Sequence, residues 1–101
     1  MTPRWAARVD ENHTAIVKAL RQIPGVTVAD TSRAGEGFPD LVVGRLGRNH
    51  LIELKNPDVE PARRKLTPAQ REFRRTWTGQ YAVAETLEQV LEEIGLGELN
   101  R

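Results

Sequence analysis

The chain has 101 residues and no cysteine, with 39% hydrophobic residues, 29% charged residues and a formal net charge of +1. This length and composition predict one globular domain over 1–101 and exclude disulfides, thiolate chemistry and cysteine zinc sites. No apolar run approaches the roughly 20 residues of a membrane-spanning helix, and the N-terminal sequence lacks the apolar stretch of a signal peptide, so we expect a cytoplasmic protein.

The basic residues are unevenly distributed along the chain. Residues 1–84 contain 14 of the 15 Lys and Arg residues, whereas 85–101 contain 5 of the 14 Asp and Glu residues. The densest basic stretch, RRKLTPAQREFRR at 63–75, has six basic residues and one acidic residue. A basic patch of this kind is an electrostatic footprint of nucleic-acid binding, although a solvated helix face has the same pattern.

The first half of the chain predicts a helix followed by three strands. Apolar residues at helical spacing predict a helix over 10–22. A short alternating strand follows at 26–28, and the Gly-containing sequence TSRAGEGF at 31–38 is typical of a loop. Two further strands are predicted at 40–43 and 50–54, joined as a hairpin.

The second half predicts a helix, a strand and a last helix. Thr67 can cap a helix that begins at Pro68, and Gln70 can complete a capping box. A strand follows at 81–84, and the apolar stripe over 86–94 is typical of an amphipathic helix. The predicted order is αβββαβα, which indicates an α/β fold with a mixed sheet flanked by helices and a core over about residues 10–94.

Three charged residues lie on or beside the predicted buried strands. Glu53 and Lys55 are two apart and therefore point to the same face of their strand, and Asp40 begins the neighbouring strand. If the strands pair as a hairpin, Asp40 comes close to Glu53. Converging carboxylates suit Mg²⁺ or Mn²⁺, and an adjacent lysine can hold a water or a phosphate oxygen, so the set suits phosphodiester hydrolysis. The alternative is a solvated Glu53–Lys55 pair, with Asp40 as a turn residue.

The first predicted helix brings a histidine toward this sheet. His13 lies seven residues before Leu20 and almost on the apolar stripe, whereas Glu11 lies half a turn away from it. We therefore expect His13, and not Glu11, to face the sheet. There it could ligate a metal, hold a water or contact DNA, or it could simply pack beside the core.

The sequence Pro-Asp at 39–40, followed by Glu-Leu-Lys at 53–55, resembles the PD-(D/E)xK nuclease signature. The predicted order of elements is similar to the αβββαβ, restriction-endonuclease-like core of that superfamily. The string GxGFPDLVVGRxGRNHLIELKN, followed by RRKLTPAQREFRRTW, resembles the small phage-type VRR-NUC nucleases, which are relatives of the archaeal-type Holliday junction resolvases. This likeness extends from about residue 10 to residue 94.

The resemblance implies roles for individual residues. Asp40 and Glu53, with the backbone carbonyl of Leu54, would bind the catalytic Mg²⁺ or Mn²⁺ ion. Lys55 would position the attacking water or stabilise the transition state. Gln70 matches a glutamine that the family carries near the site, and helix capping is the competing role for this residue.

The resemblance also bears on the first helix, the loop and the basic residues. The family places a Glu in its first helix as an additional metal or water ligand, and His13 aligns best with that position, which leaves the number of metal ions open. Similar resolvases carry a Ser near the scissile strand in the loop before the Asp, which points to Ser32. Contacts to the DNA backbone are expected from the basic residues Arg33, Arg63, Arg64, Lys65, Arg71, Arg74 and Arg75.

Together these features predict a divalent-metal-dependent endonuclease that acts on branched double-stranded DNA, as a Holliday junction resolvase in the cytoplasm of a bacterial or phage-infected cell. Symmetric cutting of two strands requires two sites related by a twofold axis, so we expect a homodimer. The alternatives are a nickase or flap-type nuclease without junction preference, and a catalytically degenerate DNA-binding module of the same fold. We expect no organic cofactor and no membrane partner.

Overall fold

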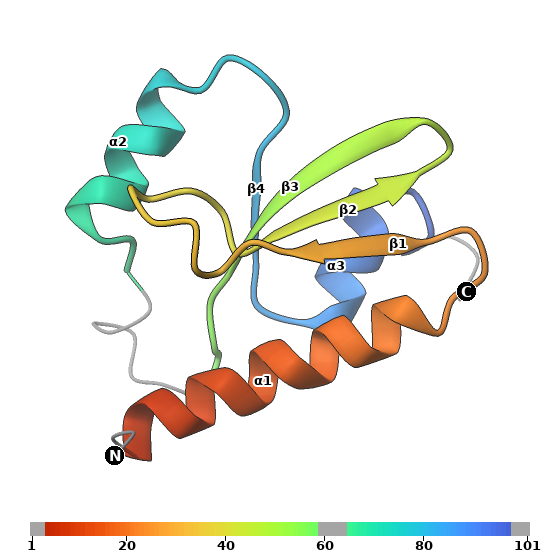
Figure 1. Cartoon of the computed structure of the whole chain (residues 1–101), viewed down its shortest axis with the longest axis horizontal. Helices are drawn as coiled ribbons and strands as arrows, with labels where there is room; N and C mark the ends of the chain where they lie inside the picture. Colours follow the sequence, from red (N-terminus) through yellow and green to blue (C-terminus); the bar gives the residue numbers. More distant parts are fainter. Residues whose placement is uncertain (1–3, 59–64, 98–101) are drawn as a thin grey trace.

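A four-stranded sheet and three helices make up the structure (Figure 1), a computed structural model that describes residues 4–58 and 65–97. In chain order the elements are α1 (Arg4–Arg21), β1 (Thr27–Asp30), β2 (Leu41–Arg45), β3 (Arg48–Leu54), α2 (Pro68–Thr76), β4 (Ala82–Ala84) and α3 (Leu87–Glu93). This order confirms the predicted α/β class and the succession αβββαβα. Several boundaries differ from the prediction: α1 begins at Arg4, β1 continues to Asp30, β2 continues to Arg45 and β3 begins at Arg48.

The sheet is mixed and has the order β1-β2-β3-β4. β1 and β3 both pair with β2 in antiparallel fashion, whereas β3 and β4 are parallel. The predicted hairpin is confirmed, with a two-residue turn at Leu46 and Gly47, whose φ angles of 52° and 77° are typical of the tight turns that match strand twist. Parallel strands need a crossover, and the connection from β3 to β4 contains α2.

The hydrophobic core lies on one face of the sheet, where α1 and α3 pack. Alternate strand positions such as Leu41, Val43 and Ile52 are fully buried there, and each such side chain contributes about 1.5–3 kcal/mol. The helices contribute Ile16, Val17 and Leu20 from α1, and Val90 and Leu91 from α3. Among the described helices, none combines the length and the apolar character needed to cross a membrane.

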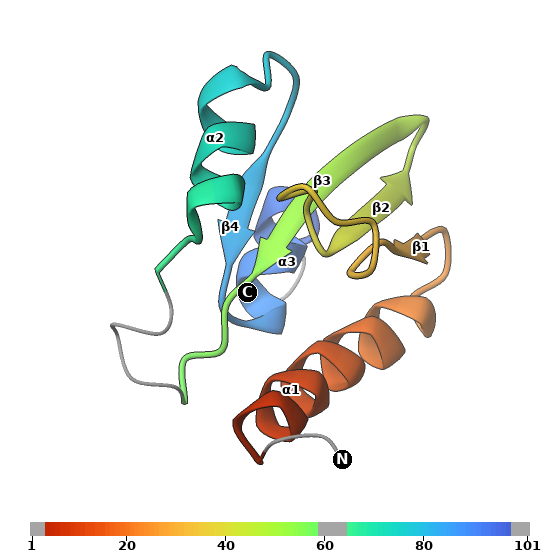
Figure 2. The same cartoon turned by 60° about the vertical axis from the view of Figure 1, so that its left-hand side comes forward.

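The helix α2 lies away from α1 in both views (Figures 1 and 2) and buries none of its own residues completely. An aromatic cluster holds it, because the Phe73 ring lies 5.4 Å from Phe38 and 5.9 Å from Tyr81, measured between centroids. The loop before β2 also touches α2 closely. Gly37 has a φ of 77°, and a Cβ there would collide with the Ala69 carbonyl and lie 2.8 Å from the next backbone nitrogen. This contact fixes the start of α2 relative to β2.

Candidate active site

The strand register brings two of the predicted acidic residues together. Leu41 of β2 pairs with Ile52 of β3, so Asp40 stands opposite Glu53 at the next position. The Asp40 carboxyl lies close enough to that of Glu53 to raise its pKa. Glu53 is only 1% exposed although it is an acidic residue. The strand register therefore places Asp40 beside Glu53 as predicted, and Glu53 is buried more deeply than a strand end would require, whereas Asp40 is half-buried.

Burial makes the charge on Glu53 costly. Its Oε2 accepts a hydrogen bond from Nε2 of Gln70 at 3.0 Å and lies 3.7 Å from Nζ of Lys55. No described residue donates a hydrogen bond to its Oε1. Burial, followed by contact with the Asp40 carboxyl, raises the pKa of Glu53 from 4.5 to about 8, although Lys55 acts in the opposite direction. Two carboxylates this close repel each other unless a proton or a positive charge compensates.

Gln70 connects the start of α2 to this carboxylate pair. Its Oε1 accepts a hydrogen bond from Nζ of Lys55 at 2.8 Å, and its Nε2 donates to Glu53. The same Oε1 accepts the backbone N–H of Thr67 at 2.9 Å, while the Thr67 hydroxyl caps the Gln70 nitrogen. The predicted capping box is confirmed, and Gln70 also contacts the acidic pair. One residue therefore ties the helix start to the site.

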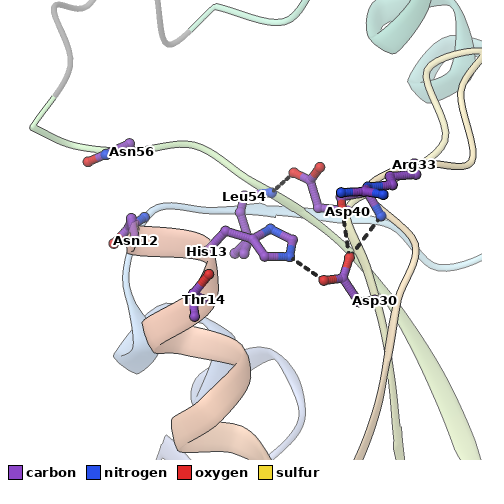
Figure 3. A pocket seen from close by; sticks show the side chains of 9 residues that line it. Asn12, His13, Thr14, Asp30, Arg33, Asp40, Leu54 and Asn56 are labelled. Carbon is purple, nitrogen blue, oxygen red and sulfur yellow. Dashed lines mark hydrogen bonds and ion pairs between the residues drawn. The ribbon is translucent and has the colours of Figure 1, made fainter. Parts of the chain in front are cut away.

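Asp40 also reaches the backbone of the neighbouring strand. Its Oδ2 accepts a hydrogen bond from the Leu54 nitrogen at 2.9 Å (Figure 3). Both residues line a pocket of about 620 Å³ between α1 and the loop after β1. The lining does not include Glu53 and Lys55, which lie on the other face of β3, beside Gln70. The other lining residues that were predicted for the site are His13, Ser32 and Arg33.

The histidine of α1 takes the expected orientation. The side chain of His13 is 14% exposed, and its Nε2 lies 3.0 Å from Oδ2 of Asp30, whereas Glu11 is exposed. Asp30 was not predicted as a site residue, because the first strand was expected to end at residue 28. The register pairs Asp30 with Leu41, directly beside Asp40. Had the first strand been extended to residue 30, the acidic residue at its end would have identified Asp30 as a candidate.

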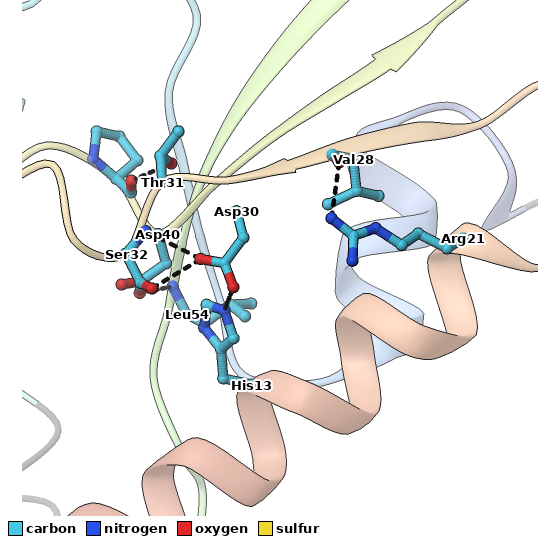
Figure 4. Close-up of polar contacts among 9 residues, drawn as sticks. His13, Arg21, Val28, Asp30, Thr31, Ser32, Asp40 and Leu54 are labelled. Carbon is cyan, nitrogen blue, oxygen red and sulfur yellow. Dashed lines mark hydrogen bonds and ion pairs between the residues drawn. The ribbon is translucent and has the colours of Figure 1, made fainter.

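Ser32 contacts this newly found aspartate (Figure 4). Its hydroxyl and its backbone N–H donate to Oδ1 of Asp30 at 2.7 and 3.0 Å. The Ser32 hydroxyl, with smaller contributions from its N–H and from His13, outweighs the effect of burial and lowers the pKa of Asp30 from 3.8 to about 2. Asp30 is therefore a carboxylate at any working pH. The role of Ser32 beside a scissile strand stays a prediction.

The basic residues of the predicted DNA-binding set lie mostly on α2 or next to it. Arg71 and Arg74 are exposed on the helix, and Lys65 is exposed just before it. Arg75 is exposed as well, but its guanidinium donates to both carboxylate oxygens of Glu72, at 3.0 and 2.6 Å. Two of the predicted residues, Arg63 and Arg64, lie outside the described residues. Arg33 is exposed at the pocket.

The fit of the site to a divalent cation can be tested on its donor atoms. Within residues 4–58 and 65–97, no three His, Asp or Glu side chains form a ready-made metal cluster. Asp40 and Glu53 stand at paired positions of neighbouring strands and offer hard oxygen ligands, and no described residue donates a hydrogen bond to Oε1 of Glu53. Mg²⁺ is usually held by one or two carboxylates and keeps several of its waters. The two carboxylates therefore suit an Mg²⁺ or Mn²⁺ ion that keeps several of its waters, and do not form a site in which every ligand is a protein atom.

Comparisons of the chain with models of known protein families, with curated proteins and with solved structures give no significant match. The chemistry of the site must therefore be inferred from its own residues.

Proposed function

We propose that this chain is a divalent-metal-dependent endonuclease with a PD-(D/E)xK-type site on a restriction-endonuclease-like fold. The observation that carries the proposal is the buried Glu53, which stands opposite Asp40 in the strand register and 3.7 Å from Nζ of Lys55. Burying two carboxylates in contact destabilises a fold unless something compensates for the repulsion. Strongly perturbed carboxylates of this kind are concentrated at functional sites.

In this proposal Asp40, Glu53 and the carbonyl of Leu54 hold Mg²⁺ or Mn²⁺. The ion supplies a lowered pKa for a bound water and neutralises charge that develops on the phosphate. Lys55 adds a positive charge that stabilises the same phosphate oxygens. Its ammonium is oriented by the 2.8 Å hydrogen bond to Gln70, so the start of α2 sets where this charge stands.

The proposed substrate is branched double-stranded DNA, with the four-way Holliday junction as the natural target. Three exposed cations on and before α2, Lys65, Arg71 and Arg74, can contact backbone phosphates next to the site. Such contacts position DNA without reading its sequence. The preference for junctions is supported by the sequence resemblance, and symmetric cutting would require a homodimer. Sedimentation that shows only monomer, with and without junction DNA, would contradict the dimer.

The test is a cleavage assay on a labelled four-way junction and a linear duplex of matched sequence. Each DNA is incubated with Mg²⁺, Mn²⁺ or EDTA, with the wild type, with Glu53→Gln and with Glu92→Gln, which removes one exposed negative charge on α3. Paired symmetric cuts in the junction alone, lost in EDTA and in Glu53→Gln but kept in Glu92→Gln, support the proposal.

Other outcomes distinguish the alternatives. Equal cutting of junction and duplex leaves a metal-dependent nuclease and removes the junction preference. Cutting of nicked and flapped DNA at the same rate as junctions favours a nickase or flap-type enzyme. Binding without cutting under any condition refutes the catalytic assignment and favours a DNA-binding module of the same fold.

A further inference from the structure

The hydrogen-bonded chain formed by Ser32, Asp30 and His13 is not part of the carboxylate pair, yet it lines the same pocket as Asp40 (Figures 3 and 4). We propose that Asp30 is a positioning residue, which holds the imidazole of His13 so that its Nδ1 serves as a hydrogen-bond acceptor in the pocket beside Asp40. The inference rests on the proposed function, because the water that His13 would orient lies on the substrate side of the proposed nuclease site.

The geometry gives each oxygen of Asp30 a separate partner. Oδ1 accepts both the hydroxyl and the backbone N–H of Ser32, at 2.7 and 3.0 Å, which leaves Oδ2 for Nε2 of His13 at 3.0 Å. Asp30 ends the strand β1, and His13 belongs to the helix α1, so two regular elements fix the pair. A side chain held from regular elements is placed more precisely than one held from a loop.

The chemistry of the two groups then determines the tautomer of the histidine. An ionised carboxylate can only accept hydrogen bonds, so Nε2 of His13 must carry the proton that the bond requires. In a neutral imidazole with a proton on Nε2, Nδ1 is the acceptor. No other described residue makes a hydrogen bond with His13. Nδ1 therefore has an open acceptor position.

The surroundings show what this acceptor can meet. Figure 3 shows the His13 ring beside Leu54 and turned toward Asp30, with Asp40 above Asp30 in the view. The pocket of about 620 Å³ has room for a phosphate group and several waters. A water at Nδ1 of His13 would donate one hydrogen bond to the imidazole and remain close to the Asp40 side of the site. His13 would thus orient this water, and Asp30 would act only through His13.

A purely structural role for the bond between Asp30 and His13 is the competing explanation, and it predicts a different result. The side chain of Asp30 is 42% exposed, and an ion pair with so much water contact contributes little to stability. We therefore expect Asp30→Asn to leave the melting temperature nearly unchanged. The asparagine has the same shape as the aspartate, but its amide can donate to Nε2, which would favour the tautomer with the proton on Nδ1.

The first readout is the ¹⁵N NMR spectrum of His13 in the full chain, which does not depend on catalysis. The wild type should carry its proton on Nε2 in the neutral form, and Asp30→Asn should increase the population with the proton on Nδ1. The control Glu92→Gln should give the wild-type spectrum. A proton on Nδ1 in the wild type, or an unchanged tautomer in Asp30→Asn, would overturn the inference.

The second readout is a double-mutant cycle on junction cleavage. Asp30→Asn should lower kcat by about 10- to 100-fold, the usual effect of losing a partner that orients a functional histidine, with little change in KM. In a His13→Ala background the same substitution should change kcat less than about twofold, because the residue it acts through is absent. Equal losses in both backgrounds would contradict positioning through His13.

Two further outcomes are separable from the inference. A wild type that cleaves no DNA refutes the proposed function, while the NMR spectrum still decides whether Asp30 sets the tautomer. If Asp30→Asn fails to fold, Ser32→Ala replaces it in the kinetic readout, and the wild-type NMR spectrum alone decides the tautomer. That variant keeps the Asp30 carboxylate but loses the 2.7 Å hydrogen bond from the Ser32 hydroxyl that holds it. Ser32→Ala should therefore lower kcat less than Asp30→Asn does. In the His13→Ala background Ser32→Ala should not lower kcat.

Discussion

Replacing Glu53 by glutamine should stabilise the metal-free protein at alkaline pH. The pKa of this buried acid is raised from 4.5 to about 8, first by burial and then by the Asp40 carboxyl. Between these two pH values the folded chain holds a proton that the unfolded chain has released. The free energy of unfolding therefore falls as the pH rises from 4.5 to about 8. The variant Glu53→Gln has no proton to lose there, so it should not show this fall.

The magnitude follows from the same pKa change. A rise from 4.5 to about 8 corresponds to about 5 kcal/mol if the site behaves as a rigid and dry interior. Relaxation and water entering beside Asp40, which lines the pocket, reduce this effect, and we expect roughly 2–3 kcal/mol above pH 8. For a domain of this size the difference corresponds to about 10 °C or more in the melting temperature.

The assay is thermal unfolding in EDTA at several values between pH 5 and pH 9, followed by circular dichroism. Glu53→Gln should melt above the wild type at pH 9 and close to it at pH 5, whereas the control Glu92→Gln should follow the wild type throughout. Adding Mg²⁺ at pH 9 should raise the melting temperature of the wild type and not that of Glu53→Gln, because the ion replaces the proton between the carboxylates. A Glu53→Gln protein that melts below the wild type at pH 9 in EDTA would refute this reasoning.

Two pairs of substitutions test how α2 is placed and how it contacts DNA. Gly37→Ala should lower the free energy of unfolding by about 2–4 kcal/mol and remove most cleavage, because the new Cβ collides with the α2 backbone at a position with positive φ. The control Gly35→Ala should lose only about 1 kcal/mol, because it has the same positive φ without a collision. Equal melting temperatures for the two variants would contradict the contact. Arg74→Ala should reduce the slope of DNA affinity against salt by about 1, and Arg75→Ala by less, because Arg75 is already paired with Glu72. Salt titrations that give the same slope change for both variants would contradict this ranking.

The sequence predicts the central pair because strand periodicity and pairing are local rules. Two apolar strands separated by a short turn fix a hairpin, and the hairpin register then places Asp40 opposite Glu53. Helical spacing is equally local, which is why the orientation of His13 relative to Glu11 could be predicted. The capping box at Gln70 was predicted for the same reason.

Contacts between distant elements were not predictable in this way. Asp30 was missed because strand ends depend on pairing with β2, and the alternation of Val26 and Val28 gives no reason to extend the strand. The second role of Gln70, which ties Lys55 to the start of α2, depends on the close approach of the loop at Gly37 to that helix. Packing of this kind is decided by tertiary structure and leaves no periodic pattern in the sequence.

The most direct measurement compares junction cleavage and junction binding by the wild type and by Asp40→Asn in Mg²⁺. Asparagine keeps the shape of Asp40 and can still accept the Leu54 hydrogen bond, but it removes one of the two carboxylates proposed to hold the ion. The proposed mechanism predicts that Asp40→Asn binds the junction as tightly as the wild type and does not cut it. Cleavage by Asp40→Asn at the wild-type rate would contradict the assignment of this carboxylate pair as the metal site.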